Sequence, residues 1–175
     1  ITGDDASFAT VGNWADAGTG TTSVADGGTG HETALKIEAG NSGNQGAKLH
    51  EQYLNEADTG AVATLYVTHR YQINFDYKWV SKTNDGAVRV GDTAGAGLTN
   101  DNLNEWRAYE DTITASTGNL IEIYVNTTGG ANTDELWIDN ITLVDLDVSE
   151  QTKVTITTGK GAATIGDGLQ TNQPF

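Results

Sequence analysis

Residues 65–80 have the sequence LYVTHRYQINFDYKWV, and their pattern predicts the fold class of the chain. From Tyr71 to Trp79, large apolar side chains alternate with four polar ones, Gln72, Asn74, Asp76 and Lys78. A period of two places successive side chains on opposite faces of a β-strand. The stretch therefore predicts a long strand with one face buried in the core and the other face polar.

Further strands are predicted on both sides of this stretch. The same alternation occurs in Ala34–Ala39, Ala87–Gly91, Trp106–Ala115, Leu120–Asn126 and Leu136–Val144, and it is weaker in Thr21–Ala25 and Gly46–Tyr53. Glycine-rich turn clusters separate these segments, and helical periodicity is almost absent. Eight or more short strands broken by glycine turns predict an all-β protein, an antiparallel β-sandwich with jelly-roll topology.

The glycine-rich segment Gly91–Gly97 could suggest a nucleotide site. It follows a strand, but no helix opens after it and it lacks the lysine of a phosphate-binding loop. We therefore expect a flexible loop there.

Length and charge restrict the domain organisation and the partners. The 175 residues suit one domain. Nine Lys and Arg residues against 24 Asp and Glu residues give a net charge of −15, which repels nucleic acid. The absence of cysteine excludes thiol catalysis. No apolar run approaches the roughly 20 residues of a membrane span, so we expect none.

The end of the chain differs from the rest. We place the sandwich in residues 1–148 and treat residues 149–175 as a C-terminal extension. Thr152–Thr158 is rich in β-branched residues, and a polar, glycine-containing end follows it. We expect this segment to pair with a sheet edge of its own copy or of a neighbouring copy, which would allow self-assembly. The alternative is a linker to a further domain.

Catalytic signatures are not found in the sequence. It contains no zincin motif, no nucleophile elbow and no P-loop. His31, His50 and His69 are scattered, and each is expected to be an ordinary surface or strand residue. With 24 carboxylates, some pair will have the separation that glycosidases use by chance alone. We therefore expect that the protein is not an enzyme.

Several landmarks follow one another in a fixed order along the chain. They are Phe8 and Trp14 around a glycine, the strand His31–Ile37, the strand Tyr71–Phe75, Trp106 before a late strand, and the closing motif Trp137-Ile138-Asp139-Asn140-Ile141-Thr142-Leu143. In this order they resemble the carbohydrate-binding modules of the galactose-binding-like jelly-roll superfamily, especially families four, nine and twenty-two. The resemblance covers about Asp4 to Asp145, and residues 89–95 resemble versions found in bacteriophage tail and virion proteins.

The resemblance implies a structural calcium ion. Many modules of that superfamily hold calcium between an early carboxylate and the aspartate of the closing motif, which corresponds to Asp139. The early acid position of the family is Ala9 in this chain, so Asp5, or Asp4, from the neighbouring turn is the candidate for the second ligand. Calcium takes six to eight oxygen ligands, and backbone carbonyls would supply the others. Alternatively, Asp139 caps a turn or joins a hydrogen-bond network.

Sugar binding requires aromatic faces for stacking and polar side chains for the hydroxyl groups. The candidates on a concave sheet face are Gln72, Asn74, Asp76, Trp79, Arg89, Glu122 and Tyr124, with Trp79 and Tyr124 as the stacking rings. The resemblance implies that Trp14, Trp106 and Trp137 pack in the core or at the edge of the sandwich. For each polar candidate, the alternative is that it only keeps the sheet solvated. Aromatic residues are few, so we expect weak binding.

Three functions remain open at this point. The first is a non-catalytic, carbohydrate-binding-module-like domain of an extracellular or virion protein, with a polysaccharide or cell-surface glycan as its partner. The second is a structural subunit of a virion appendage or extracellular filament, assembled by β-strand contacts. The third is a β-sandwich polysaccharide hydrolase or lyase. All three imply an extracellular location.

Overall fold

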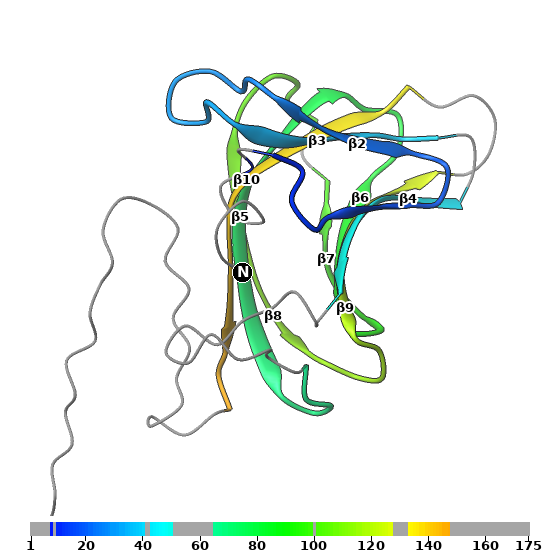
Figure 1. Cartoon of the computed structure of the whole chain (residues 1–175), viewed down its shortest axis with the longest axis vertical. Helices are drawn as coiled ribbons and strands as arrows, with labels where there is room; N and C mark the ends of the chain where they lie inside the picture. The colour runs from blue at the N-terminus through cyan, green and yellow to red at the C-terminus, as the bar shows by residue number, and fades with distance from the viewer. Residues whose placement is uncertain are drawn as a thin grey trace, which may run out of the picture.

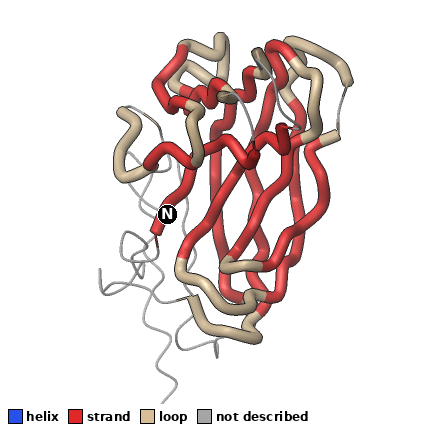
Figure 2. Tube along the Cα trace, turned by 90° about the vertical axis from the view of Figure 1, so that its right-hand side faces the viewer, coloured by secondary structure: helices blue, strands red, loops and turns tan. Residues whose placement is uncertain are grey.

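A computed structural model describes residues 8, 10–40, 43–50, 65–99, 101–127 and 133–147, with only the backbone of Asn44 and His50. Within these ranges the chain forms strands and loops, and Figure 2 shows no helix. Accordingly, no helix of the described part is long and apolar enough to cross a membrane. The strands are β1 (Ala15–Ala17), β2 (Thr21–Ala25), β3 (Ala34–Glu38), β4 (Gly43–His50), β5 (Arg70–Ser81), β6 (Gly86–Val90), β7 (Thr93–Leu98), β8 (Arg107–Thr114), β9 (Leu120–Thr127) and β10 (Glu135–Asp145).

The strands form two five-stranded sheets that face each other (Figure 1). Sheet A has the order β1-β4-β9-β6-β7, and sheet B has the order β2-β3-β10-β5-β8. All strand pairs are antiparallel. Most connections cross from one sheet to the other, because neighbours in sequence usually belong to different sheets. The predicted all-β antiparallel sandwich with jelly-roll topology is confirmed.

The core lies between the sheets and contains the inner face of β5. The predicted alternation of this strand is confirmed, since every second side chain is buried: Tyr71, Ile73, Phe75, Tyr77 and Trp79. Facing residues from β9 and β6 in sheet A include Ile121, Ile123, Val125, Val88 and Val90. Full burial of a large apolar side chain contributes roughly 1.5–3 kcal/mol, so this face is a main source of stability.

The structure differs from the sequence-based expectation at four strands. The strand predicted from Leu65 begins five residues later, at Arg70. The glycine-rich segment predicted as a flexible loop contains β7, which pairs with β6 across a register shift. Gly95 lies so close to Asp111 and Ile113 that a Cβ atom would collide with both, which explains why this position holds glycine. In addition, β4 begins three residues earlier than predicted, and the three-residue β1 was not predicted.

Aspartate side chains connect the two sheets at both open sides of the sandwich. Asp16 of β1 accepts a hydrogen bond from the amide of Thr22 in β2, at 2.7 Å. On the other side, Asp111 of β8 accepts one from the amide of Ala96 in β7, also at 2.7 Å. Each aspartate therefore satisfies a backbone donor on an edge strand of the opposite sheet.

Trp79 is a core residue, so the expectation that its ring stacks on a sugar is wrong. The side chain is 0% exposed, and its indole Nε1 donates to the carbonyl of Leu98 at 3.3 Å. Trp79 follows the buried Tyr77 by two residues, so the alternation along β5 turns its side chain inward as well.

We expect Trp79→Ala to lower the free energy of unfolding by about 3–5 kcal/mol, because a large cavity replaces the indole ring. Urea denaturation followed by circular dichroism measures this, with the half-buried neighbour Val80→Ala as the control. A Trp79→Ala protein of unchanged stability would contradict the assignment.

Candidate functional site

The seven predicted sugar-binding residues do not share one face, so the prediction of a single cleft is wrong. Gln72, Asn74 and Asp76 belong to β5 and lie on the outer face of sheet B. Arg89, Glu122 and Tyr124 belong to β6 and β9 and lie on the outer face of sheet A. Alternation along a strand separates inner from outer side chains, but it does not say which sheet the strand joins. The molecule therefore offers two outer faces to compare.

On the outer face of sheet B, each of the three predicted residues forms a hydrogen bond with a residue of a neighbouring strand. The hydrogen bonds run from Gln72 Nε2 to Glu110 Oε1 at 2.7 Å, from Asn74 Nδ2 to Thr142 Oγ1 at 3.3 Å, and from Asn140 Nδ2 to Asp76 Oδ2 at 2.8 Å. Such cross-strand pairs stabilise a sheet. This arrangement agrees with the alternative reading that these side chains serve the sheet itself.

Next to these bonds, Lys78 lies between two tryptophans. Its Nζ is 4.0 Å from the centroid of the Trp137 ring and 4.9 Å from that of Trp106. The imidazole of His31 stacks on Trp106 with 3.9 Å between centroids and 18° between planes. Both Lys78 Nζ and Trp106 Nε1 donate to the carbonyl of Gly27, at 3.4 and 3.2 Å. The loop before β3 is thus fastened onto the outer face of sheet B.

The three tryptophans outside β5 therefore have different places. Trp14 is buried in the core, as the resemblance implies. Trp137 lies on the outer face of sheet B, and Trp106 covers that face from the segment before β8. The outward position of Trp137 could have been predicted from the sequence, because the apolar residues on either side of it, Leu136 and Ile138, point into the core. No signal of this kind existed for Trp106 and His31, which meet only in the folded chain.

The outer face of sheet A is organised in rows. Directly opposite residues of an antiparallel pair point to the same face, so the register defines rows of side chains across the sheet. The tyrosine row runs from β1 to β7 through Ala17, Gly46, Tyr124, Ala87 and Gly97. Beside it, the charged row runs through Ala15, Lys48, Glu122, Arg89 and Ala94. Tyr124 is the one large side chain of its row, and each row extends about 19 Å across the five strands.

Arg89 links the two rows. Its Cζ lies 4.7 Å from the centroid of the Tyr124 ring, and its Nη1 lies 3.3 Å from Glu122 Oε2. Gly46 stands opposite Tyr124, and a Cβ atom there would collide with the tyrosine. Tyr124 is only 5% exposed, so the prediction of an open stacking ring at Tyr124 is wrong. A sugar could contact this ring only after Arg89 moved away from it.

Lys48 adds a second cation to the charged row. It is the direct cross-strand partner of Glu122 on one side, as Arg89 is on the other. The three charged groups therefore lie on three adjacent strands, beside a row of small residues. This combination places hydrogen-bond donors and acceptors for an extended ligand along one line of the sheet.

Comparison with known proteins supports the fold. No family model and no curated protein matches the chain. Among solved structures, the CBM22-1 xylan-binding domain of Paenibacillus barcinonensis Xyn10C matches with a TM-score of 0.51 and 12% identity, over 85% of this chain and 90% of that chain. This chain has the jelly-roll fold of carbohydrate-binding modules.

Two larger enzymes contain a similar domain. The CBM22-1 and GH10 modules of Clostridium thermocellum xylanase 10B, solved with xylohexaose, match with a TM-score of 0.54 and 13% identity over 86% of this chain. An arabinose-bound α-L-arabinofuranosidase, MgGH51, matches with a TM-score of 0.54 and 12% identity over 76% of this chain. The matches cover 27% and 23% of those chains, so this chain spans about a quarter of each.

The carbohydrate-binding-module fold raises the question of calcium at Asp139. This carboxylate is 6% exposed, and burial raises its pKa. Its Oδ2 lies 2.9 Å from His31 Nδ1, and its Oδ1 accepts the amide of Asn140 at 2.7 Å. Among the described residues, no group of three or more histidine or acidic side chains could hold a metal ion. These donors alone do not fit calcium, and the predicted partner Asp5 lies outside the described residues, so the ion stays a prediction.

We expect His31→Ala to destabilise the protein, because buried Asp139 loses one of the two hydrogen-bond partners that it has among the described residues. The expected loss is about 1–3 kcal/mol, measured by thermal melting in a chelator, with the exposed loop neighbour Glu32→Ala as the control. An unchanged melting temperature would show that the pair contributes nothing.

Melting curves of the unmodified protein with saturating calcium test the ion, since a ligand that binds the folded state alone must raise the melting temperature.

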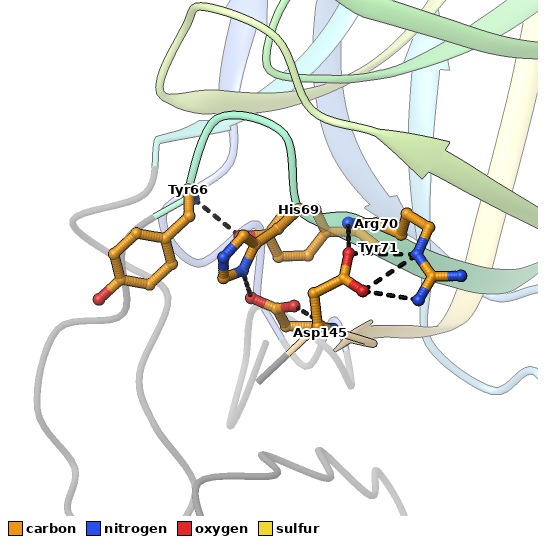
Figure 3. A network of polar contacts seen from close by, with 6 residues as sticks. Tyr66, His69, Arg70, Tyr71 and Asp145 are labelled. Carbon is orange, nitrogen blue, oxygen red and sulfur yellow. Dashed lines mark hydrogen bonds and ion pairs between the residues drawn. The ribbon is translucent and has the colours of Figure 1, made fainter. Parts of the chain in front are cut away.

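A second polar network joins the start of β5 to the end of β10 (Figure 3). His69 Nδ1 lies 2.8 Å from Asp145 Oδ2, and the hydroxyl of Tyr71 accepts the amide of Tyr66 at 2.8 Å. The side chain and amide of Arg70 donate four hydrogen bonds to the carboxylate of Asp147, at 2.6–3.2 Å. The network fastens the last described residues of the chain to β5. His31 and His69 are thus paired residues, which the sequence had not indicated.

Asp147 gives this network a dependence on pH. Hydrogen bonds from the side chain and then the amide of Arg70 lower the pKa of Asp147 to about 2. Aspartate in an unfolded chain has a pKa of about 3.9. Because the folded value is the lower one, the stabilisation is present above about pH 4 and is lost as the pH falls toward 2.

We therefore expect Asp147→Asn to lower the melting temperature at neutral pH, and the difference from the unmodified protein to shrink between about pH 4 and pH 2. Melting curves at a series of pH values measure it. Asn74→Ala, which removes the neutral hydrogen bond from Asn74 to Thr142 on the same strand as Arg70, should show a difference that does not depend on pH in this range. A constant difference for Asp147→Asn would contradict the role given to Arg70.

Proposed function

We propose that the domain binds a polysaccharide, without catalysing a reaction, through the outer face of sheet A. The observation that supports this proposal is the arrangement of the two rows. Lys48, Glu122 and Arg89 form a line of charged hydrogen-bonding groups, and the tyrosine row beside it consists of small residues around Tyr124. A chain of sugar rings laid across the strands would meet donors and acceptors along its edge.

The other outer face is a weaker candidate. On sheet B, the amides of Gln72 and Asn74 already have cross-strand partners. The loop before β3 covers part of the same face, and Trp106 is enclosed between His31 and Lys78. A sugar would have to replace these contacts. On sheet A, Arg89 makes one 3.3 Å contact with Glu122 and its side chain is 35% exposed, so it can donate further hydrogen bonds.

We expect the binding to be weak. The ring of Tyr124 is covered by Arg89, and an arginine over an aromatic face contributes roughly 0.5–1 kcal/mol at an exposed site. Stacking of a sugar on this ring would first have to break that contact. Hydrogen bonds from the charged row would therefore provide most of the affinity.

The setting of the protein also belongs to this proposal. We propose an extracellular location, because polysaccharide is an expected ligand outside cells. Assembly through residues 149–175, with a second copy as partner, stays a prediction because the extension lies outside the described residues.

Paired variants on the two faces test the proposal. Arg89→Ala with Glu122→Ala removes two groups of the charged row, and Gln72→Ala with Asn74→Ala removes two outer groups of sheet B. For a polysaccharide found by screening a wide panel, calorimetry should show at least about fivefold weaker binding by the sheet A variant and unchanged binding by the sheet B variant. The reverse result would move the site to sheet B. No binding by the unmodified protein to any member of the panel would end the proposal.

A further inference from the structure

We propose that the glycan bound by sheet A is acidic, a polysaccharide whose sugar rings carry carboxylate groups. This inference rests on the proposed function and concerns the class of ligand. It is carried by the two cations of the charged row, Lys48 and Arg89, and by their placement beside the tyrosine row.

Lys48 differs from every other cation of the described part. The others have partners: Lys36 with Glu38 and Glu135, Arg70 with Asp147, Lys82 with Asp85 and Asp101, Arg89 with Glu122, Arg107 with Glu105, and Lys78 with two tryptophan rings. Among the described residues, Lys48 makes no ion pair within 4.0 Å, although the chain has 24 acidic residues. An ammonium group that makes no ion pair within the described part of so acidic a protein is a candidate to bind an anion from outside.

Arg89 also has N–H donors that its contact with Glu122 does not use. Its contact with Glu122 is a single one at 3.3 Å, whereas Arg70 binds Asp147 through several shorter hydrogen bonds. A guanidinium group has five N–H donors in a planar fork that matches a carboxylate. The exposed part of Arg89 can therefore receive a ligand carboxylate in a bidentate arrangement.

The spacing of the two cations suits one extended chain. Lys48 lies on β4 and Arg89 on β6, with β9 between them, so their backbones are two strand spacings or about 10 Å apart. In an extended β-linked polysaccharide, successive rings are turned over, and groups on the same edge recur at every second ring. A chain that follows the tyrosine row would thus present carboxylates to both cations from alternate rings.

Glu122 between the cations does not cancel their charge. The three side chains carry two positive charges and one negative charge, so the charged row is positive by one on a protein of net charge −15. Repulsion from the distant acidic groups is screened over about 8 Å at physiological ionic strength, whereas contacts at the row are within that distance. Glu122 is then left to accept hydrogen bonds from ligand hydroxyl groups.

The experiment compares polysaccharides that carry carboxylates with matched polysaccharides that do not. Three matched pairs are used: cello-oligosaccharides oxidised at C6 and their parents, glucuronoxylan and the same xylan without its uronic acid, and galacturonan and its carboxyl-reduced form. Calorimetry should show that the acidic member of at least one pair binds about tenfold more tightly than its neutral partner. Lys48→Gln should remove most of this preference, and Lys48→Arg should keep it.

Control variants separate charge at this site from charge elsewhere. Lys36→Gln removes a cation from the outer face of sheet B and should leave the preference unchanged. Because Lys48 makes no ion pair within the described part of the chain, we expect Lys48→Gln to melt at the temperature of the unmodified protein, so its loss of binding would not reflect unfolding.

Other outcomes overturn the inference in distinguishable ways. If a neutral polysaccharide binds as tightly as its acidic partner, and the Arg89 and Glu122 variant weakens both, the acidic ligand class is wrong and the proposed function remains. If acidic members bind more tightly but Lys48→Gln and Lys36→Gln have equal effects, the preference does not arise at the charged row. If no member of any pair binds, the inference and the proposed function both fail.

Discussion

The inner face of β5 must lie against the inner face of sheet A, and the rest of the structure depends on this contact. Five large side chains from Tyr71 to Trp79 are buried there, opposite the aliphatic residues of β6 and β9. Burial of one face of a strand determines the direction of every other side chain, because a slip of one residue would exchange the two faces. The positions of Lys78 on sheet B and of Glu122 on sheet A follow from this packing.

The two outer faces are used differently as a consequence. On sheet B, a lysine between two tryptophans and a histidine stacked on one of them hold a loop against the strands. On sheet A, small residues such as Gly46 and Ala87 stand on both sides of Tyr124, and charged groups stand in the next row. The first face satisfies its polar groups internally. The second leaves Lys48 without a partner in the described part and Arg89 with spare donors, which is the condition for binding something else.

Local pattern predicted much of the fold but little of the site. The alternation in residues 71–79 was sufficient for the buried and polar faces of β5, and the limits of β2 were predicted as the structure has them. The assignment of strands to sheets was not available from alternation, because it depends on pairing between distant segments. This is why Gln72 and Arg89 were placed on one face when they lie on opposite faces.

The pairs of His31 with Asp139 and of His69 with Asp145 join residues 108 and 76 positions apart, and no local pattern marks them. β7 is a strand in spite of its glycines because β6 offers it a partner.

The aspartates at the sheet edges limit where a further strand could be added. The amide of Thr22 on edge strand β2 and the amide of Ala96 on edge strand β7 already donate to Asp16 and Asp111. A strand that paired at either amide would have to displace a charge-assisted hydrogen bond, which is stronger than a neutral one. The remaining edge strands are β1 with three residues and β8 with eight. Strand addition gains affinity from consecutive backbone hydrogen bonds, so β8 offers the longer template for any segment that joins the sandwich, whether from this chain or from another copy.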